Sequence, residues 1–149
     1  LPFSAGPNVM FPWGSNSAVL NNAIILGTAD DLGADEDYLN AVTQGMDYLL
    51  GRNAMNQSYI TGYGERPLLN PHHRFWANQT NSAFPSAPPG AVSGGPNTGL
   101  DDPLAAAELT GCAPQKCFLD HIDSWSTNEI TINWNSPLAW VAAFLDSLP

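Results

Sequence analysis

Charged residues are scarce in this sequence, and basic residues are the scarcest of all. Only 12% of the 149 residues are charged, about half the usual share. Four Lys and Arg stand against 14 Asp and Glu, which gives a formal net charge of −10. An acidic chain repels phosphate backbones and anionic membrane surfaces, so nucleic acids and membranes are excluded as favoured partners. A neutral ligand such as a sugar is compatible with this charge.

Long hydrophobic runs and cysteines are also nearly absent. No stretch of the sequence approaches the roughly 18 apolar residues of a membrane span. The chain begins Leu-Pro-Phe-Ser-Ala-Gly, without a basic region or an initiating Met, so we expect a mature or truncated N-terminus rather than a signal peptide. Cys112 and Cys117 fit neither a zinc pair nor a redox motif. Their spacing leaves open a small disulfide, as in secreted proteins, or two free thiols.

Helical periodicity is present at both ends of the chain. Hydrophobic residues make up 44% of it, which is enough for a core. The spacing predicts an all-α chain with helices from Ser15 or Asn16 to Gly33, from Asp35 to Gly51, from Pro103 to Leu109 and from Ser136 to Leu145. Because the link between the first two is so short, we expect them to form an antiparallel hairpin.

The stretch 62–101 shows no sustained periodicity and is rich in Pro and Gly. A loop of this length inside a compact domain is usually functional or disordered, and its aromatic and polar residues argue against disorder. One helical hairpin and a terminal helix give a thin core, and the loop needs a surface to lie on. We therefore expect the chain to be a piece of a larger helical protein, or to pack on another chain.

One cluster of chemically capable residues is Asn70-Pro71-His72-His73-Arg74 in the long loop. The arginine offers a planar fork of donors for carboxylates or sugar hydroxyls. The alternative is a solvated histidine pair, which spacing alone favours. A metal site is less favoured still, because no third ligand is evident nearby.

The second cluster combines carboxylates with tryptophans: Asp120, Asp123, Glu129, Trp125 and Trp134. Paired carboxylates suit glycoside chemistry, because one carboxyl must hold a proton to give to the leaving oxygen. Tryptophan faces stack on sugar rings. The alternative is a capping box, in which Ser126-Thr127-Asn128-Glu129 ends in a glutamate that closes a helix start. Spacing alone does not separate the two interpretations.

Several segments resemble family 9 glycoside hydrolases, cellulases of the endoglucanase type. The first signature is carried by Ser58-Tyr-Ile-Thr61, Gly64, Arg66 and Pro71-His72-His73-Arg74. The second is carried by Phe118-Leu-Asp120, Trp125, Glu129, Thr131 and Asn135-Ser136. Further likeness lies in the stretch from Trp13-Gly-Ser to Tyr48-Leu-Leu-Gly-Arg-Asn53, and in Ser93-Gly-Gly-Pro-Asn97. The resemblance covers nearly the whole chain, with both signatures in the expected order.

The resemblance implies an (α/α)6 barrel, of which residues 1–149 would be the C-terminal portion of the catalytic domain, a partial barrel of helical hairpins with long active-site loops. It implies hydrolysis of β-1,4-glucosidic bonds in cellulose and cello-oligosaccharides, with inversion. Glu129 matches the general acid of the family. The catalytic base of the family is an aspartate in an Asp-x-Gly-Asp motif, and no such motif occurs in this chain. We therefore expect the base to come from elsewhere.

The resemblance also implies roles for the residues around Glu129. His72 matches the active-site histidine, and Asp120 matches the carboxylate that supports the site. The sugar-binding positions implied are His73, Arg74, Trp125 and Trp134, the last against the sugar near the cleavage point.

The remaining expectations concern cofactors, location and partners. We expect no required cofactor. Asp101 and Asp102 are a weak calcium candidate, since calcium takes roughly six to eight oxygen ligands, and the alternative is a solvated helix start. We expect a secreted protein whose partners are a β-1,4-glucan and the missing part of the barrel. The alternatives are a non-catalytic glucan-binding fragment and a fragment that self-associates through exposed apolar faces.

Overall fold

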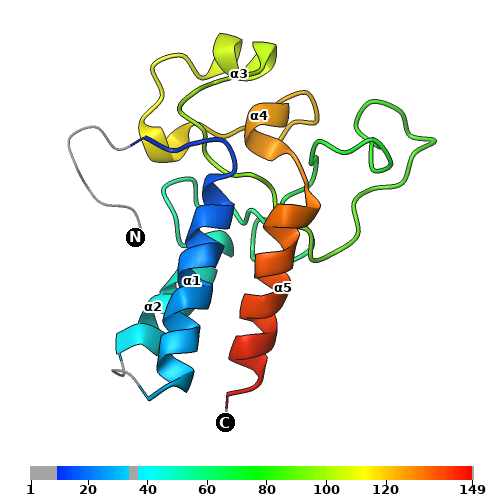
Figure 1. Cartoon of the computed structure of the whole chain (residues 1–149). Helices are drawn as coiled ribbons and strands as arrows, with labels where there is room; N and C mark the ends of the chain where they lie inside the picture. The colour runs from blue at the N-terminus through cyan, green and yellow to red at the C-terminus, as the bar shows by residue number, and fades with distance from the viewer. Residues whose placement is uncertain (1–9, 34–36, 149) are drawn as a thin grey trace.

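The computed structural model describes residues 10–33 and 37–148, and within them every regular element is a helix (Figure 1). The elements are α1 (Ser15–Asp31), α2 (Asp37–Leu49), α3 (Pro103–Glu108), the 3-10 turn η1 (Pro114–Lys116), α4 (Trp125–Asn128) and α5 (Ile132–Asp146). In the same residues, pairing between extended segments is limited to isolated bridges. The all-α prediction is therefore confirmed, and no helix of the described chain is long and apolar enough to cross a membrane.

Three long helices form the body of the molecule. α1 packs against both α2 and α5, and the irregular segments gather at one end of this group (Figure 1). The core between the helices includes Val19 and Leu20 from α1, Val42 and Leu49 from α2, and Val141 from α5. The predicted hairpin of α1 and α2 is thus present. The predicted cap at Asp35 lies outside the described residues.

The start of α1 differs from the prediction. Gly14, in the left-handed region with φ of 81°, occupies the N-cap position, and Ser15 and Asn16 lie inside the first turn. Both side chains are buried and donate to the long loop, from Ser15 Oγ to Pro96 O at 2.7 Å and from Asn16 Nδ2 to Ser93 O at 2.9 Å. These polar side chains do not cap the helix because they fix the loop across its end.

The long loop remains irregular, as predicted, and its last part is buried. Val92 and Ser93 are fully buried, and Asn135 of α5 pairs with Val92 as a neighbouring strand would. The Val92 N–H donates to Asn135 Oδ1 at 2.8 Å, and Asn135 Nδ2 donates to Val92 O at 3.2 Å. The surface that the loop needs is thus supplied by the first turns of α1 and α5. This tertiary pairing accompanies an α5 that starts at Ile132, before the predicted Ser136.

α3 begins at Pro103, as predicted, but its cap is not solvated. Asp102 is 1% exposed, and its carboxylate accepts hydrogen bonds from the Ala105 N–H at 2.6 Å, the Ser126 N–H at 3.0 Å and Ser126 Oγ at 2.5 Å. The expectation of a solvated helix start is therefore wrong for Asp102, because the same carboxylate also holds α4. Nearby, Cys112 and Cys117 form a disulfide, which decides between the two alternatives left open by their spacing.

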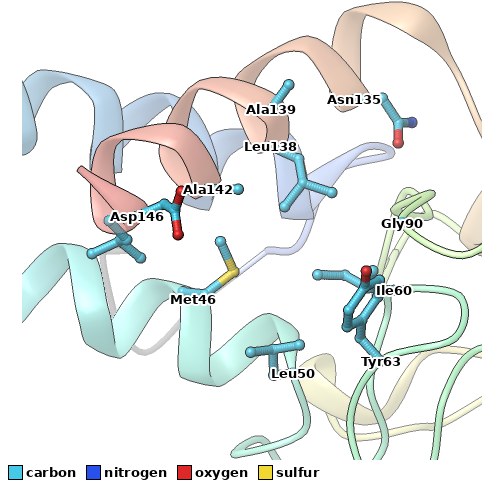
Figure 2. A pocket seen from close by; sticks show the side chains of 11 residues that line it. Met46, Leu50, Ile60, Tyr63, Gly90, Asn135, Leu138, Ala139, Ala142 and Asp146 are labelled. Carbon is cyan, nitrogen blue, oxygen red and sulfur yellow. The ribbon is translucent and has the colours of Figure 1, made fainter. Parts of the chain in front are cut away.

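An apolar groove of about 570 Å³ separates α2 from α5. Figure 2 shows Met46 of α2 and Leu50, the residue after α2, on one side and Leu138 and Ala142 of α5 on the other, with Ile60 at one end. Both helices pack on α1, so the groove is the part of their apolar surface that α1 does not cover.

Two buried tyrosines give the core a sensitivity to alkali. The rings of Tyr48 and Tyr59 lie 5.7 Å apart, and neither hydroxyl has a hydrogen-bond partner among the described residues. Burial raises the pKa of Tyr48 to about 12 and, together with the nearby Tyr48, raises the pKa of Tyr59 above its ordinary value. Both groups therefore stay protonated in the folded chain at pH values where they ionise in the unfolded chain, near pH 10.

We expect the free energy of unfolding to be constant with respect to these tyrosines below about pH 10 and to fall as the pH rises towards 12. Thermal unfolding followed by circular dichroism across this range measures the slope. Tyr48→Phe should flatten it and should leave stability at neutral pH unchanged or raised, because a buried hydroxyl without a partner costs about 1–3 kcal/mol. Tyr63→Phe, at an exposed tyrosine, is the matched control. A slope unchanged by Tyr48→Phe contradicts the assignment.

Candidate active site

Main-chain hydrogen bonds bring the two signature segments together. The His72 N–H donates to Asn128 O at 2.9 Å, and the Ile130 N–H donates to His72 O at 3.3 Å. These bonds make a parallel bridge that sets His72 beside Glu129. The two clusters, which are far apart in the sequence, are therefore adjacent in the fold, as a shared site requires.

Asp120 anchors the histidine segment. Its Oδ2 accepts from the Leu69 N–H at 2.9 Å and from Gln57 Nε2 at 3.1 Å, and its Oδ1 accepts from the Asn70 N–H at 2.7 Å. Asn128 adds a bond from Nδ2 to Asn70 O at 2.6 Å. Both oxygens of Asp120 are thus occupied in holding the backbone that leads into His72.

The imidazole of His72 is oriented by a carbonyl. Its Nδ1 lies 2.5 Å from Ile122 O. A carbonyl oxygen only accepts hydrogen bonds, so Nδ1 must carry a proton whether the ring is neutral or charged. Nε2 has no hydrogen-bond partner among the described residues, and it is the nitrogen left for another group.

Glu129 follows α4 directly and adopts an extended backbone, with φ −67° and ψ 145°. The capping box is not formed, because Ser126 lies within α4 and Glu129 lies beyond its last residue. The side chain is half-buried, and its carboxylate accepts no hydrogen bond from the described part of the chain. It is therefore free for chemistry, while Asp102 holds the short helix that precedes it.

The two residues after His72 differ in exposure. His73 stacks on Trp76, with ring centroids 4.0 Å apart, and its Nδ1 accepts from the Phe75 N–H at 3.3 Å. Burial, and to a lesser extent the neighbouring His72, lower the pKa of His73 below its ordinary value. Arg74 is exposed and makes no ion pair or hydrogen bond within the described chain, so its guanidinium is available to a ligand.

The aromatic residues of the site lie in different environments. Trp134 is 8% exposed and packs in the core, where a Cβ atom at Gly14 or Gly94 would lie 2.9 Å or 2.8 Å from its ring. Its predicted contact with sugar stays a prediction. Trp125 is half-buried and lies 5.0 Å, centroid to centroid, from the exposed Trp13. Sequence reasoning missed this pair, because nothing in the spacing links the two residues.

The described residues hold no group of three or more His, Cys, Asp or Glu side chains that could bind a metal ion. Two cavities lie next to the site and are lined by residues near His72 and Glu129 in the sequence and by parts of the long loop. One of about 310 Å³ is bounded by His73, Trp76, Ile130 and Thr131, and another of about 330 Å³ is bounded by Asn70, Trp76, Gln79 and Ile122.

Comparison with known proteins assigns the chain to a family. The family model described as glycosyl hydrolase family 9 matches residues 3–142, which is most of the sequence. The chain belongs to glycosyl hydrolase family 9. The resemblance seen in the two signatures is thereby confirmed.

Among curated family 9 relatives, a cellulose 1,4-beta-cellobiosidase of Acetivibrio thermocellus is 57% identical over 139 residues, covering 93% of this chain and 16% of the relative. Endoglucanase C of Cellulomonas fimi is 48% identical, covering 93% of this chain and 13% of the relative. A cellodextrinase of Butyrivibrio fibrisolvens is 46% identical, covering 87% of this chain and 23% of the relative. The chain thus spans less than a quarter of the length of these relatives.

Solved structures agree on the fold. A thermostable endoglucanase from Alicyclobacillus acidocaldarius superposes with a TM-score of 0.80 at 40% identity, covering 92% of this chain and 26% of that one. A second solved chain, in complex with cellobiose-like isofagomine, gives a TM-score of 0.81 at 40% identity with the same coverage. The family 9 chain described here therefore has the helical fold of part of an (α/α)6 barrel.

Proposed function

We propose that this chain contributes the general-acid half of an active site that hydrolyses β-1,4-glucosidic bonds of cellulose and cello-oligosaccharides with inversion. The observation that carries the proposal is the bridge between His72 and Glu129, which sets a carboxylate without hydrogen bonds from the described chain beside an oriented histidine. Family membership and relatives named cellobiosidase, endoglucanase and cellodextrinase support the reaction class.

In this proposal, Glu129 gives its proton to the glycosidic oxygen as the bond to the anomeric carbon breaks. A base on the opposite face of the ring activates water, and in inverting enzymes it lies about 6.5–9.5 Å from the acid. Asp120 is unsuited to that role, because both of its oxygens hold backbone N–H groups. We propose that the base comes from outside this chain, with the exposed Asp123 as the alternative within it.

Substrate binding is proposed for the residues around the acid. His73 and Arg74 supply polar contacts to sugar hydroxyls, and Trp125 and Trp134 supply aromatic surface. Hydrolysis by one carboxyl group as acid and another as base needs no cofactor.

We also propose that the protein is secreted. The Cys112–Cys117 disulfide supports this, since such bonds persist in oxidising compartments.

The partner that completes the barrel is proposed to dock in the groove between α2 and α5. The groove is apolar, and the match covers only 26% of each of two solved family 9 chains, so most of each of those chains lies outside the match. We propose that a helix from the remaining part of such a barrel fills this groove, rather than a second copy of this chain.

A substitution on the groove wall tests the docking. Ala142 is exposed and lines the groove, whereas the next residue, Ala143, is exposed and does not line it. In a barrel chimaera, in which residues 3–142 replace the matching part of the Acetivibrio thermocellus relative, Ala142→Arg should destabilise the barrel by about 1–3 kcal/mol through overpacking. For these variants the graft is extended to residue 148. In the isolated chain, Ala142→Arg and the control Ala143→Arg should melt alike. Equal melting of the two variants in the chimaera contradicts the docking proposal.

Reducing-sugar release tests the function itself. The barrel chimaera should release reducing ends from cellulose, with inversion observed by NMR of the fresh product, whereas the 149-residue chain alone should bind cello-oligosaccharides without hydrolysing them. A chimaera that folds and binds cellulose but releases no sugar would leave the non-catalytic binding fragment as the better interpretation, which the missing base already favours for the isolated chain.

A further inference from the structure

Ile122 is fixed on both sides of its Cα atom. Its carbonyl accepts from His72 Nδ1 at 2.5 Å, and its N–H donates to Gln79 Oε1 at 2.8 Å. These two groups belong to the two peptide planes that flank the Cα, so holding both sets φ and ψ of the residue. The Ile122 side chain is itself 6% exposed, which anchors the segment further.

Gln79 comes from a different part of the molecule from the other groups that hold this segment. Asp120 holds Leu69 and Asn70, and the His121 carbonyl accepts from Asn128 Nδ2 at 3.3 Å. Gln79 instead belongs to the exposed turn 77–84 of the long loop, which is closed by a bond from Thr80 N to Ala77 O at 3.0 Å. It reaches Ile122 across the end of a cavity of about 330 Å³ that both residues line.

Removing the Gln79 amide would leave the Ile122 N–H facing that cavity without an acceptor from the described chain. The peptide plane that carries the Ile122 N–H would then be held only at its His121 carbonyl, which accepts from the Ser124 N–H at 2.9 Å and from Asn128 Nδ2 at 3.3 Å. We expect this plane to move more freely about the Ile122 Cα, and the carbonyl in the next plane is the group that selects the proton position on His72. The chain of contacts therefore runs from the exposed turn, through one residue of main chain, to the imidazole beside Glu129.

We propose that Gln79 is a positioning residue, which fixes the Ile122 carbonyl and thereby holds His72 in the tautomer that carries its proton on Nδ1. In the neutral ring, Nε2 then carries no proton, and it is held in a fixed position facing the substrate. This inference rests on the proposed function of the His72–Glu129 site. It extends that site to a loop residue that neither signature includes.

The tautomer is measured directly by NMR of the chain labelled with 15N-histidine, which contains three histidines. In the unmodified chain, His72 should show a protonated Nδ1 with slow exchange. In Gln79→Leu, which keeps the size of the side chain but removes the acceptor, His72 should move to a mixture in which Nε2–H is prominent, and exchange of the Ile122 amide should accelerate. Gln79→Glu retains an acceptor oxygen at the same distance and should preserve the pattern of the unmodified chain.

A merely structural role for Gln79 would change stability without changing the tautomer. If Gln79→Leu does not fold, Gln79→Ser, which is too short to reach Ile122, takes its place in the same measurement. In the barrel chimaera, Gln79→Leu should lower kcat by about tenfold or more with little change in KM, because misplacement of a catalytic group costs rate rather than binding. An unchanged His72 spectrum in Gln79→Leu would overturn the proposal, and so would a changed tautomer with unaltered kcat.

The two proposals fail separately. The NMR measurement needs neither substrate nor base, so an unchanged tautomer leaves the acid role of Glu129 standing. Full turnover by a Glu129→Gln chimaera would remove the acid role and would leave the tautomer of His72 as it is.

Discussion

Glu129→Gln in the barrel chimaera should lower kcat on cellulose by about 10²–10⁴-fold, the usual contribution of a positioned general acid. The substitution keeps the shape of the side chain but removes the proton that the leaving oxygen needs. Stability should change little, because the carboxylate makes no hydrogen bond with the described chain and is only half-buried. The measurement is steady-state reducing-sugar release, with folding checked by thermal melting.

A substrate that needs no protonation separates an acid from a structural residue. On a dinitrophenyl cellobioside, whose leaving group departs as a stable anion, Glu129→Gln should retain most of the activity of the parent. Glu108→Gln is the matched control, since it makes the same change at an exposed position at the end of α3. Equal losses on cellulose and on the activated substrate would contradict the acid assignment.

Asp102→Ala should have the largest effect on stability of any carboxylate substitution considered. The buried carboxylate accepts from the Ala105 N–H, from the N–H and Oγ of Ser126, and from Ser124 Oγ at 3.4 Å. Its removal leaves the Ala105 N–H and both Ser126 donors buried without an acceptor, while Ser124 Oγ keeps its 2.7 Å contact with Thr127 Oγ1, so we expect a loss of about 3–5 kcal/mol in the free energy of unfolding. Because Ser126 lies in the helix before Glu129, activity of the chimaera should fall as well.

Urea unfolding of the isolated chain measures this loss. Asp102→Asn keeps one acceptor oxygen and should lie between the parent and Asp102→Ala. Asp123→Ala, at a carboxylate 69% exposed, is the control for loss of a charge and should shift stability by less than about 0.5 kcal/mol. A loss in Asp102→Ala no larger than that of Asp123→Ala would show that the buried network does not support α4.

Local signals predicted the helices, and tertiary contacts decided their ends. Periodicity predicted α1 and α2, and Pro103 and Pro137 indicated α3 and α5, because proline suits the first turn of a helix. Ser15 and Asn16 resembled caps, but their side chains bond to residues 93 and 96. Asn135 similarly pairs with Val92 at the start of α5. Such partners are distant in sequence, so no local pattern announces them.

The candidate site was predictable only in part, for the same reason. Spacing alone could not choose between a catalytic Glu129 and a capping box, and the structure excludes the box because α4 ends before that residue. The burial of Asp102, the contact of Trp13 with Trp125 and the bond from Ile122 to Gln79 all join separate segments. The roles proposed for His72 and Glu129 come from the family resemblance, and main-chain pairing shows that the two residues are neighbours.

The bridge between residues 72 and 129 is made by main-chain N–H and C=O groups alone. Its alignment therefore does not depend on which side chains stand at either position. A chemist could replace the imidazole or the carboxylate with other reactive groups and still find them presented side by side. The backbone thus fixes the relative position of two residues at which other reactive side chains can be introduced.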